Sequence, residues 1–501
     1  VTIDLSGGAL RNVVETADGH TEFIIESSPD PTSGGNGSGS LIALGDFLGK
    51  LTYNRQMRPD DYHYFSSPVG GLKISDFFAL NSGKVDGIWS WSEPAQDWND
   101  LTSSSDPFQS GKGYNLGHIE TGSHGSKYSF PGSVVRSASV LVSSPFITGA
   151  TAGIDRPEYD NLELVSGRDY GAGGWNLLGN PFTSAMNANT FITANAASFD
   201  PNYQAIYLYA GDEGTEGIYY WIGVDGGDWT DSQNSSTNIQ AGQGFFVLAR
   251  NNAVSFTFDN SMQLHDTDVK LKSTRQPSWP GLRLTAQSGG QSMSTLVIFN
   301  DDMSTGLDPG YDIGLLSSGR NVEIYTALVK DNGFEFARQA LPVNGYEKNI
   351  IPVGVDAPNG GTVTFSAFMV PINNGTFWLE DRTAGIITDL SRENYTVALP
   401  KNTLGTGRFF IHASPLTSTE RVILRNDLTI RIWTSNQKVY IEGEVSAKAK
   451  ASVYDMLGRK IHETRLEDVR YNTFELPSVV KGVYMVRVDD GGRSSTRKVV
   501  F

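Results

Sequence analysis

Short runs of alternating apolar and polar residues recur along the chain, separated by clusters of Gly, Asn, Asp and Ser. Runs such as residues 254–258 and 483–488 alternate with a period of two, which is typical of β-strands with one buried face. Two stretches, Ile74–Leu80 and Ala188–Ala194, have a helical pattern, and both are short. The pattern predicts an all-β protein of tandem β-sandwich or jelly-roll-like domains, ending in a small immunoglobulin-like β-sandwich.

One block of the sequence occurs twice. Its first copy contains YHYFSSPVGG (62–71), IWSW (88–91), QSGKGYNL (109–116) and KYSF (127–130). Its second copy contains GWNLLGNPFTS (174–184), IYLY (206–209), QAGQGFFV (240–247) and SFTF (255–258), in the same order. The spacing between copies drifts, as insertions between strands would cause. We therefore predict two related β units, at residues 1–150 and 151–269.

Two proline-containing polar segments divide the rest of the chain. Residues 270–281 (KLKSTRQPSWPG) and 414–420 (SPLTSTE) read as linkers or as the first edge of the next unit. Between them, strand-like runs follow one another at regular spacing, so residues 270–417 are predicted to form a β-sandwich. Residues 418–501 are predicted to form a separate C-terminal domain.

Charge is distributed unevenly over the 501 residues. The whole chain has 39 Lys and Arg against 55 Asp and Glu, a net charge of −16, which argues against general nucleic-acid binding. Residues 421–501 nevertheless contain 15 Lys and Arg against 10 Asp and Glu, a net charge of +5. Residues 1–420 therefore have a net charge of −21, and the basic tail is expected to have a partner of its own.

Several classes of site are excluded by composition. The chain has no Cys, so disulfides, thiolate metal sites and thiol nucleophiles are impossible. No apolar run is long enough to predict a transmembrane segment. The sequence starts at Val1, so either a signal peptide has been removed or the chain begins inside a longer polypeptide.

The tail contains three distinctive segments. ASVYDMLGRKI (451–461) predicts a tight β-hairpin, KGVYMVRV (481–488) predicts a strand, and RKVV (497–500) lies in a closing strand. Together they resemble the type-A C-terminal sorting domain of proteins exported by the bacterial type IX secretion system. The resemblance covers about 80 residues. It is carried by Tyr454, Asp455, Leu457, Gly458, Arg459, Gly482, Val483, Tyr484 and Lys498.

This resemblance implies that the tail is a sorting signal and not an active site. Proteins with such a tail cross the outer membrane through the type IX translocon, and an outer-membrane shuttle barrel recognises the folded sorting domain. A sortase-like peptidase then removes the domain, here expected near residues 414–421, and releases the passenger or attaches it to surface lipopolysaccharide. The resemblance thus implies a secreted protein or one on the extracellular face of the outer membrane. Segments such as 39–57, 307–312 and 377–385 similarly resemble β-rich passengers of surface proteins.

Local signals for catalysis are lacking. The sequence has no HExxH, GxSxG, GxGxxG or P-loop motif, so we expect no enzyme activity and no cofactor. Two carboxylates that meet from separate strands would still permit glycoside hydrolysis. Asp225, Asp228 and Asp231 offer oxygen ligands for Ca²⁺, although the same stretch is typical of an exposed hairpin loop.

The repeated units are rich in aromatic residues. Trp89, Trp91, Trp221 and Trp229 are candidates for a platform that stacks on sugar rings, although alternating aromatic residues in strands are more often core. Because Trp89 and Trp91 share a strand face, we expect them to be alike in burial.

We predict a non-enzymatic secreted or cell-surface protein with an adhesive or structural passenger, exported through its tail. Two alternatives stay open. In the first, the chain is an ancillary or carbohydrate-binding region of a larger secreted polysaccharide-degrading enzyme. In the second, it is a surface filament subunit whose edge strands pair between chains.

Overall fold

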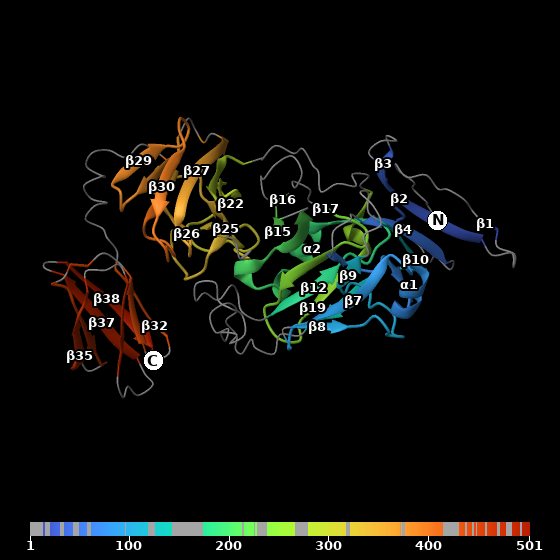
Figure 1. Cartoon of the computed structure of the whole chain (residues 1–501), viewed down its shortest axis with the longest axis horizontal. Coiled ribbons are helices and arrows are strands. Elements are labelled where there is room, and N and C mark those ends of the chain that lie inside the picture. The colour runs from blue at the N-terminus through green and yellow to red at the C-terminus, as the bar shows by residue number, and fades with distance from the viewer. Residues whose placement is uncertain are drawn as a thin grey trace.

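The computed structural model consists mostly of β-strands (Figure 1). Two α-helices occur among the described residues, α1 (Ile74–Leu80) and α2 (Ala188–Ala194), with the bounds that the sequence pattern predicts. The all-β class is therefore confirmed, while the assignment to sandwiches and jelly rolls stays a prediction. The structure describes residues 14–500 except 16–20, 31–34, 44–49, 58–61, 96, 119–125, 143–173, 213–214, 225, 228–237, 266–278, 317–320, 371, 373–375, 414–429, 436–437, 443–444, 447, 456–457, 468–470, 477–482 and 491–492.

The first unit, residues 14–134, contains two principal sheets. One has the strand order β1-β2-β4-β10-β6 with β3 beside β2, and the other has the order β5-β9-β7-β8. Helix α1 buries Ile74 and Phe77 in the apolar core of this unit. The strands are β1 (Val14–Glu15), β2 (Thr21–Asp30), β3 (Gly35–Ser38), β4 (Leu51–Met57), β5 (Tyr62–Phe65), β6 (Val69–Gly70), β7 (Val85–Ser92), β8 (Asp97–Asp100), β9 (Tyr114–His118) and β10 (Ser126–Val134).

The second unit, residues 138–264, has a main sheet of order β12-β18-β14-β15-β16 and the smaller sheets β11-β19 and β17-β13-β20. Strand β11 falls inside the predicted first unit, yet it pairs with β19 and contributes Val140 to the core of the second unit. The strands are β11 (Ala138–Leu141), β12 (Trp175–Gly179), β13 (Ala185–Asn187), β14 (Ile206–Asp212), β15 (Thr215–Gly223), β16 (Gly226–Gly227), β17 (Asn238–Ile239), β18 (Gly244–Leu248), β19 (Ser255–Phe258) and β20 (Gln263–Leu264).

The two units share an order of elements. The sheet β5-β9-β7-β8 of the first unit is equivalent to β12-β18-β14-β15 of the second. Helix α1 lies between β5 and β7 along the chain, and α2 lies between β12 and β14. Strands β10 and β19 then follow β9 and β18. Five strands and one helix thus follow the same order in both units, and the derivation of the two units from a repeat stays a prediction.

An asparagine after each helix makes equivalent hydrogen bonds. Asn81 Nδ2 donates to the carbonyl of Phe77 (2.8 Å), and its Oδ1 accepts from the backbone N–H of Ser129 (3.0 Å). Asn195 Nδ2 likewise donates to the carbonyl of Phe191 (2.9 Å), and its Oδ1 accepts from Thr257 N (2.7 Å). Each asparagine therefore satisfies polar groups at a helix end and ties that helix to the strand that closes its unit.

A glycine turn of each unit contacts the end of a strand in the other unit. Gly179 N donates to the carbonyl of Gly111 (3.0 Å), and Ser66 N donates to the carbonyl of Gly242 (2.8 Å). Gly111 and Gly242 have φ values of +86° and +68°, a conformation that favours glycine. Each turn is thus held against the end of β12 or β5 in the other unit.

An apolar cluster joins the second unit to its neighbours. Tyr207 and Phe246, on the main sheet of the second unit, share this cluster with Ile298 and Ile313 of the next region. Tyr64, from β5 of the first unit, also packs against it. Tyr207 Oη donates to the carbonyl of Gly314 (2.9 Å). The three regions are therefore in direct contact.

The third region, residues 279–413, is one long sheet of order β29-β28-β31-β26-β24-β25-β22-β21-β27-β30, with β23 beside β25. One large apolar cluster lies against its strands, including Leu284, Val353 and Ile411. The strands are β21 (Gly281–Ser288), β22 (Gln291–Phe299), β23 (Ile313–Gly314), β24 (Glu323–Thr326), β25 (Phe336–Leu341), β26 (Ile350–Asp356), β27 (Gly361–Val370), β28 (Trp378–Asp381), β29 (Ile386–Asp389), β30 (Tyr395–Leu399) and β31 (Phe409–His412).

The tail, residues 430–500, consists of the sheets β32-β33-β36 and β35-β34-β37-β38. Its apolar cluster extends from Ile432 to Val499, and the described residues that form it all belong to the tail. No described helix of the chain has the length and hydropathy needed to cross a bilayer. The strands are β32 (Arg431–Ser435), β33 (Lys438–Glu442), β34 (Lys450–Tyr454), β35 (Lys460–Arg465), β36 (Tyr471–Glu475), β37 (Val483–Asp490) and β38 (Arg493–Val500).

Candidate functional site

The hairpin between β34 and β35 contains the first distinctive segment of the tail. Asp455 N donates to the carbonyl of Arg459 (3.0 Å), and Gly458 N donates to the carbonyl of Asp455 (3.0 Å). The Asp455 carboxylate accepts from Arg459 N (2.9 Å) and Nε (2.6 Å). Gly458 has a φ of +77°, which favours glycine. The turn thus accounts for Asp455 and Gly458, while the Arg459 side chain is 75% exposed.

Strand register brings the three distinctive segments together. Tyr454 lies opposite Met485 of β37 and, next to a bulge, opposite Lys460 of β35. Met485 in turn lies opposite Lys498 of β38. These four positions, Lys460, Tyr454, Met485 and Lys498, form one row across all strands of the sheet, which we call the transverse row.

The transverse row is on the sheet face that points away from the tail core. Val453, Val486 and Val499 alternate with row positions along their strands, and all three are buried in the core. Tyr454 and Met485 are half-buried, and the Lys460 side chain is 48% exposed.

The other predicted sorting residues divide into three groups. Tyr484 packs against the tail core. Val483 begins β37. Leu457 and Gly482 lie outside the described residues.

The face that holds the transverse row has more cationic than anionic positions. By register it contains Lys450, Lys460, Arg465, Arg487 and Lys498 against Glu463 and Asp489. Lys460 Nζ lies 2.5 Å from Glu463, and Arg487 lies 2.8 Å from Asp489. The hydrogen bond that Lys460 donates to Glu463 raises the pKa of Lys460. All these pairs are exposed, so they contribute little to stability.

The aromatic candidates of the first unit lie on the face of β7 that points away from the core of that unit. Trp89 and Trp91 are both half-buried, as their shared face predicts. The Trp89 ring lies over Gly87, so close that a Cβ atom at Gly87 would be 2.2 Å from the ring. Trp91 Nε1 donates to the carbonyl of Trp175 (2.9 Å), and its ring centroid is 5.4 Å from that of Trp98. Trp91 is therefore engaged with the second unit.

Trp221 is buried at the junction between the second unit and the third region. The Arg338 guanidinium lies 5.0 Å from its ring centroid. Arg338 also donates to the carbonyls of Tyr311 (2.7 Å) and Gly310 (3.0 Å). In this arrangement Trp221 is covered and does not present a ring face to a sugar. Trp229 lies outside the described residues.

The candidate Ca²⁺ ligands Asp225, Asp228 and Asp231 also lie outside the described residues. In the part of the chain that the structure describes, no group of three or more His, Asp or Glu side chains is placed to hold a metal ion.

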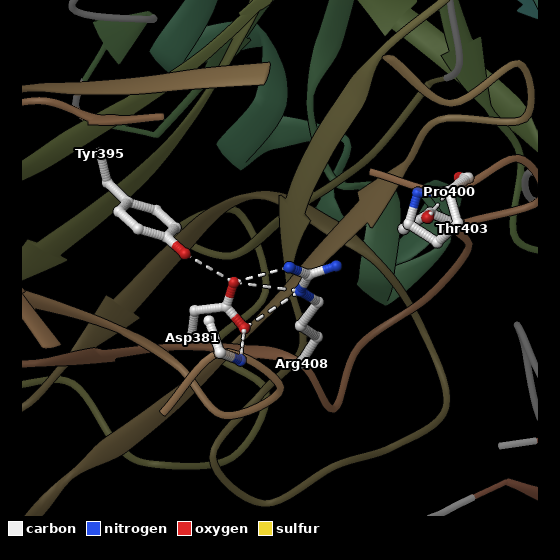
Figure 2. Close-up of polar contacts among 6 residues, drawn as sticks. Asp381, Tyr395, Pro400, Thr403 and Arg408 are labelled. Atoms are coloured by element: carbon white, nitrogen blue, oxygen red, sulfur yellow. Dashed lines mark hydrogen bonds and ion pairs between the residues drawn. The ribbon is translucent and has the colours of Figure 1, made fainter. Parts of the chain in front are cut away.

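A buried ionic cluster is present in the third region (Figure 2). The Asp381 carboxylate, at the end of β28, accepts from Arg408 Nη2 (2.7 Å) and Nε (3.0 Å) and from Tyr395 Oη (2.8 Å). Burial is the largest single influence on Asp381 and opposes its ionisation. The hydrogen bonds from Arg408, Ala384 N and Tyr395, together with the charge of Arg408, outweigh burial and lower the pKa of Asp381. Because Tyr395 is on β30, the cluster connects two strands from opposite ends of the sheet.

The neighbouring acid Glu380 is bonded on the other face of β28. Its carboxylate lies 2.9 Å from His412 Nε2 and 3.2 Å from Arg382 Nε. Burial opposes ionisation here too, and the His412 hydrogen bond helps to lower the pKa of Glu380. Adjacent strand residues point to opposite faces, so Asp381 and Glu380 cannot flank one glycosidic bond. This acidic pair serves the fold.

Comparison with known families assigns both parts of the chain. The family model described as "Domain of unknown function (DUF8693)" matches residues 36–412. The chain belongs to this DUF8693 family. C-terminal to the DUF8693 region, the model described as "Secretion system C-terminal sorting domain" matches residues 435–501. This match confirms the predicted sorting domain and identifies the chain as a substrate of type IX secretion, exported across the outer membrane.

The remaining comparisons do not extend this assignment. No curated protein matches the chain. A solved structure titled "Biofilm associated protein - BSP domain" is 8% identical, with 89% of this chain and 91% of that chain covered. Its TM-score of 0.16 is too low to indicate a shared fold, and we draw nothing from it for the DUF8693 region.

Sequence reasoning missed the buried cations of the DUF8693 region. Arg338 and Arg408 are both buried. A signal for them was present, because Arg338 lies within the apolar strand FARQAL and Arg408 directly precedes FFIH. Charged residues inside or beside apolar strands indicate buried ionic groups, since burial without a partner is costly.

Proposed function

We propose that this protein is a non-enzymatic, adhesive or structural surface passenger that type IX secretion exports through its C-terminal tail. The observation that carries the proposal is the self-contained core of the tail, from Ile432 to Val499, in the segment that matches a sorting domain. A domain with its own core can be recognised independently of what precedes it.

The folded state of the tail is part of the proposed signal. Lys460, Tyr454, Met485 and Lys498 are adjacent only through strand pairing. A receptor that reads these positions together reads a folded domain, which fits a shuttle barrel in the outer membrane. We further propose that a sortase-like peptidase cuts at residues 414–421 and that the passenger is released or attached to lipopolysaccharide at the extracellular face.

The non-enzymatic role of the passenger is supported by how its buried polar groups are used. Asp381, Glu380 and Arg338 are each bonded within the fold. The apolar cluster around Tyr207 joins three regions of the passenger, which suits a body that transmits or resists force. The filament alternative would use the exposed edges of the same body for pairing between copies.

Trp89 favours a second candidate function, carbohydrate binding in an ancillary region of a larger secreted enzyme. Its half-buried ring packs against the paired glycines Gly87 and Gly117, which leave room for an aromatic ring on this sheet face. A Trp89→Ala variant should then lose retention on insoluble polysaccharide. Trp98→Ala, in the neighbouring strand, is the control for general disturbance of the sheet. Equal retention of the wild type and both variants would contradict this second function.

The export proposal is tested by locating the chain in cells that produce it. The complete chain and a form that ends at residue 420 are compared by fractionation, with mass spectrometry of the mature C-terminus. We expect the complete chain outside the cell or on its surface and the shortened form in the periplasm. The same complete chain in a strain without the translocon is the control. Surface display of the shortened form would contradict export through the tail.

A further inference from the structure

We propose that the transverse row of Lys460, Tyr454, Met485 and Lys498 is the surface by which the export receptor holds the tail. The partner that fits it is a protein surface with an apolar centre and carboxylates on either side. This inference rests on the proposed function of the tail as the export signal.

Convergence of the distinctive segments is the first argument. Each of the three segments supplies a member of the row, and together the four members cross every strand of the sheet. Neighbouring strands are about 4.8 Å apart, so the row spans roughly 14 Å, which is a suitable size for the centre of a protein contact.

The second argument is that the tail core does not use the central row residues. Asp455 and Gly458 are explained by the turn, and Tyr484 by its contact with the core. Among the tail residues that the structure describes, Tyr454 and Met485 are neither members of the apolar cluster nor packed against it. Aromatic residues and methionine are enriched where proteins contact one another.

Charge identifies the chemistry of the partner. Five cationic and two anionic positions share the face, whereas residues 1–420 have a net charge of −21. An acidic receptor surface is repelled by the body and attracted by this face, so its approach is oriented toward the tail.

A carboxylate placed in the row provides the test. Met485→Glu in the complete chain puts an acid opposite the Lys498 position, a cross-strand arrangement compatible with folding. Ser494→Glu is the control. It makes the same charge change on the same face, about 13 Å along β38 from Lys498. Tyr454→Ser is a second row variant that adds no charge. Resistance of each purified chain to protease confirms that its tail is folded.

We expect the exported fraction of Met485→Glu to fall by about tenfold or more, the change that a loss of about 1.4 kcal/mol in binding produces. Tyr454→Ser should show a similar fall, and Ser494→Glu should stay within about twofold of the wild type. Normal export of both folded row variants would overturn the inference.

Two further arms separate this inference from its alternatives. The form that ends at residue 420 is fractionated alongside. If the shortened form is retained while Met485→Glu is exported normally, the inference about the transverse row is wrong but the sorting function of the tail stands. If the shortened form is exported, the proposed sorting function itself is wrong. Vesicles of phosphatidylglycerol are the lipid probe. Sedimentation of the wild-type chain with them, lost in Met485→Glu, would assign the row to a membrane surface and overturn a protein partner.

Discussion

Charged side chains are used in opposite ways in the third region and in the tail. In the third region the side chains of Asp381 and Arg408 are 0% and 10% exposed and meet at 2.7 Å. In the tail the side chains of Lys460 and Glu463 are 48% and 37% exposed and meet at 2.5 Å. The two pairs have similar geometry and very different surroundings.

This difference decides what each pair contributes. Removal of one partner from a buried pair leaves an uncompensated charge in a poorly polarisable interior, which is strongly destabilising. An exposed pair gains little, because water screens the attraction and two long side chains must be ordered. We therefore infer that the ionic groups of the third region hold its sheet together, while those of the tail are available for recognition.

Loss of the Asp381 carboxylate should have the largest effect. Asp381→Ala leaves the Arg408 guanidinium buried and removes the acceptor of the Tyr395 hydroxyl. We expect about 3–5 kcal/mol less stability for the third region. Hydrogen exchange read by mass spectrometry on the complete chain should show faster exchange in β28, β30 and β31. Asp489→Ala, in an exposed tail pair, is the matched control, and equal effects of the two variants would refute the comparison.

The buried carboxylate of Asp312 should make the third region sensitive to pH. Burial raises the pKa of Asp312 to about 7, above its usual value near 4. The folded state therefore holds a proton that the unfolded state releases, and the stability it contributes is present below about pH 4 and is lost as pH rises to about 7. We expect the third region to be roughly 2–3 kcal/mol less stable at pH 8 than at pH 5 from this group alone.

Replacement of Asp312 isolates its effect from other titrating groups. Asp312→Asn cannot ionise, so its stability should change less between pH 5 and pH 8 than that of the wild type. Parallel pH profiles for the two chains, measured by hydrogen exchange around β23 and β25, would rule out this carboxyl as the cause.

Loss of a neutral buried group should have a smaller effect, and we expect this effect to be of equal size in the first and second units. Asn81→Ala and Asn195→Ala each remove equivalent hydrogen bonds between a helix end and a closing strand. We expect about 1–3 kcal/mol of local destabilisation in each case. Hydrogen exchange in α1 and α2 measures this loss. Asn251→Ala, in a loop of the second unit, is the control, and a loss confined to one unit would show that the equivalence is only topological.

Local patterns predicted the elements better than their contacts. The bounds of both helices and the tail hairpin follow from periodicity and turn residues close in sequence. The bond from Arg55 to the carbonyl of Gly242 joins residues 187 positions apart, and nothing near either residue indicates it. The role of the alternating tryptophans is ambiguous in the sequence for a related reason. Buried core aromatics and an exposed sugar-stacking platform give the same alternating pattern. Trp221, for example, is covered in part by Arg338, which belongs to another region.

Replacement of an exposed tail cation should give the smallest change in stability. Such variants also test whether the receptor recognises the transverse row or only the net charge of its face. Lys460 and Arg487 have nearly equal side-chain exposure, 48% and 47%, and each is paired with one acid. Lys460→Ala and Arg487→Ala remove the same charge, one inside the row and one outside it. We expect neither to alter hydrogen exchange of β34 and β37.

Export of the same two variants should differ. Lys460→Ala removes a cation that flanks Tyr454, so the exported fraction should fall several-fold, while Arg487→Ala should remain close to the wild type. If both variants fell equally, the receptor would respond to the net charge of the face and not to the row. If the exported fraction fell only for Arg487→Ala, the receptor contact would be centred on the next row of the same face, which contains Arg487 and the Ser452 and Thr496 positions opposite it.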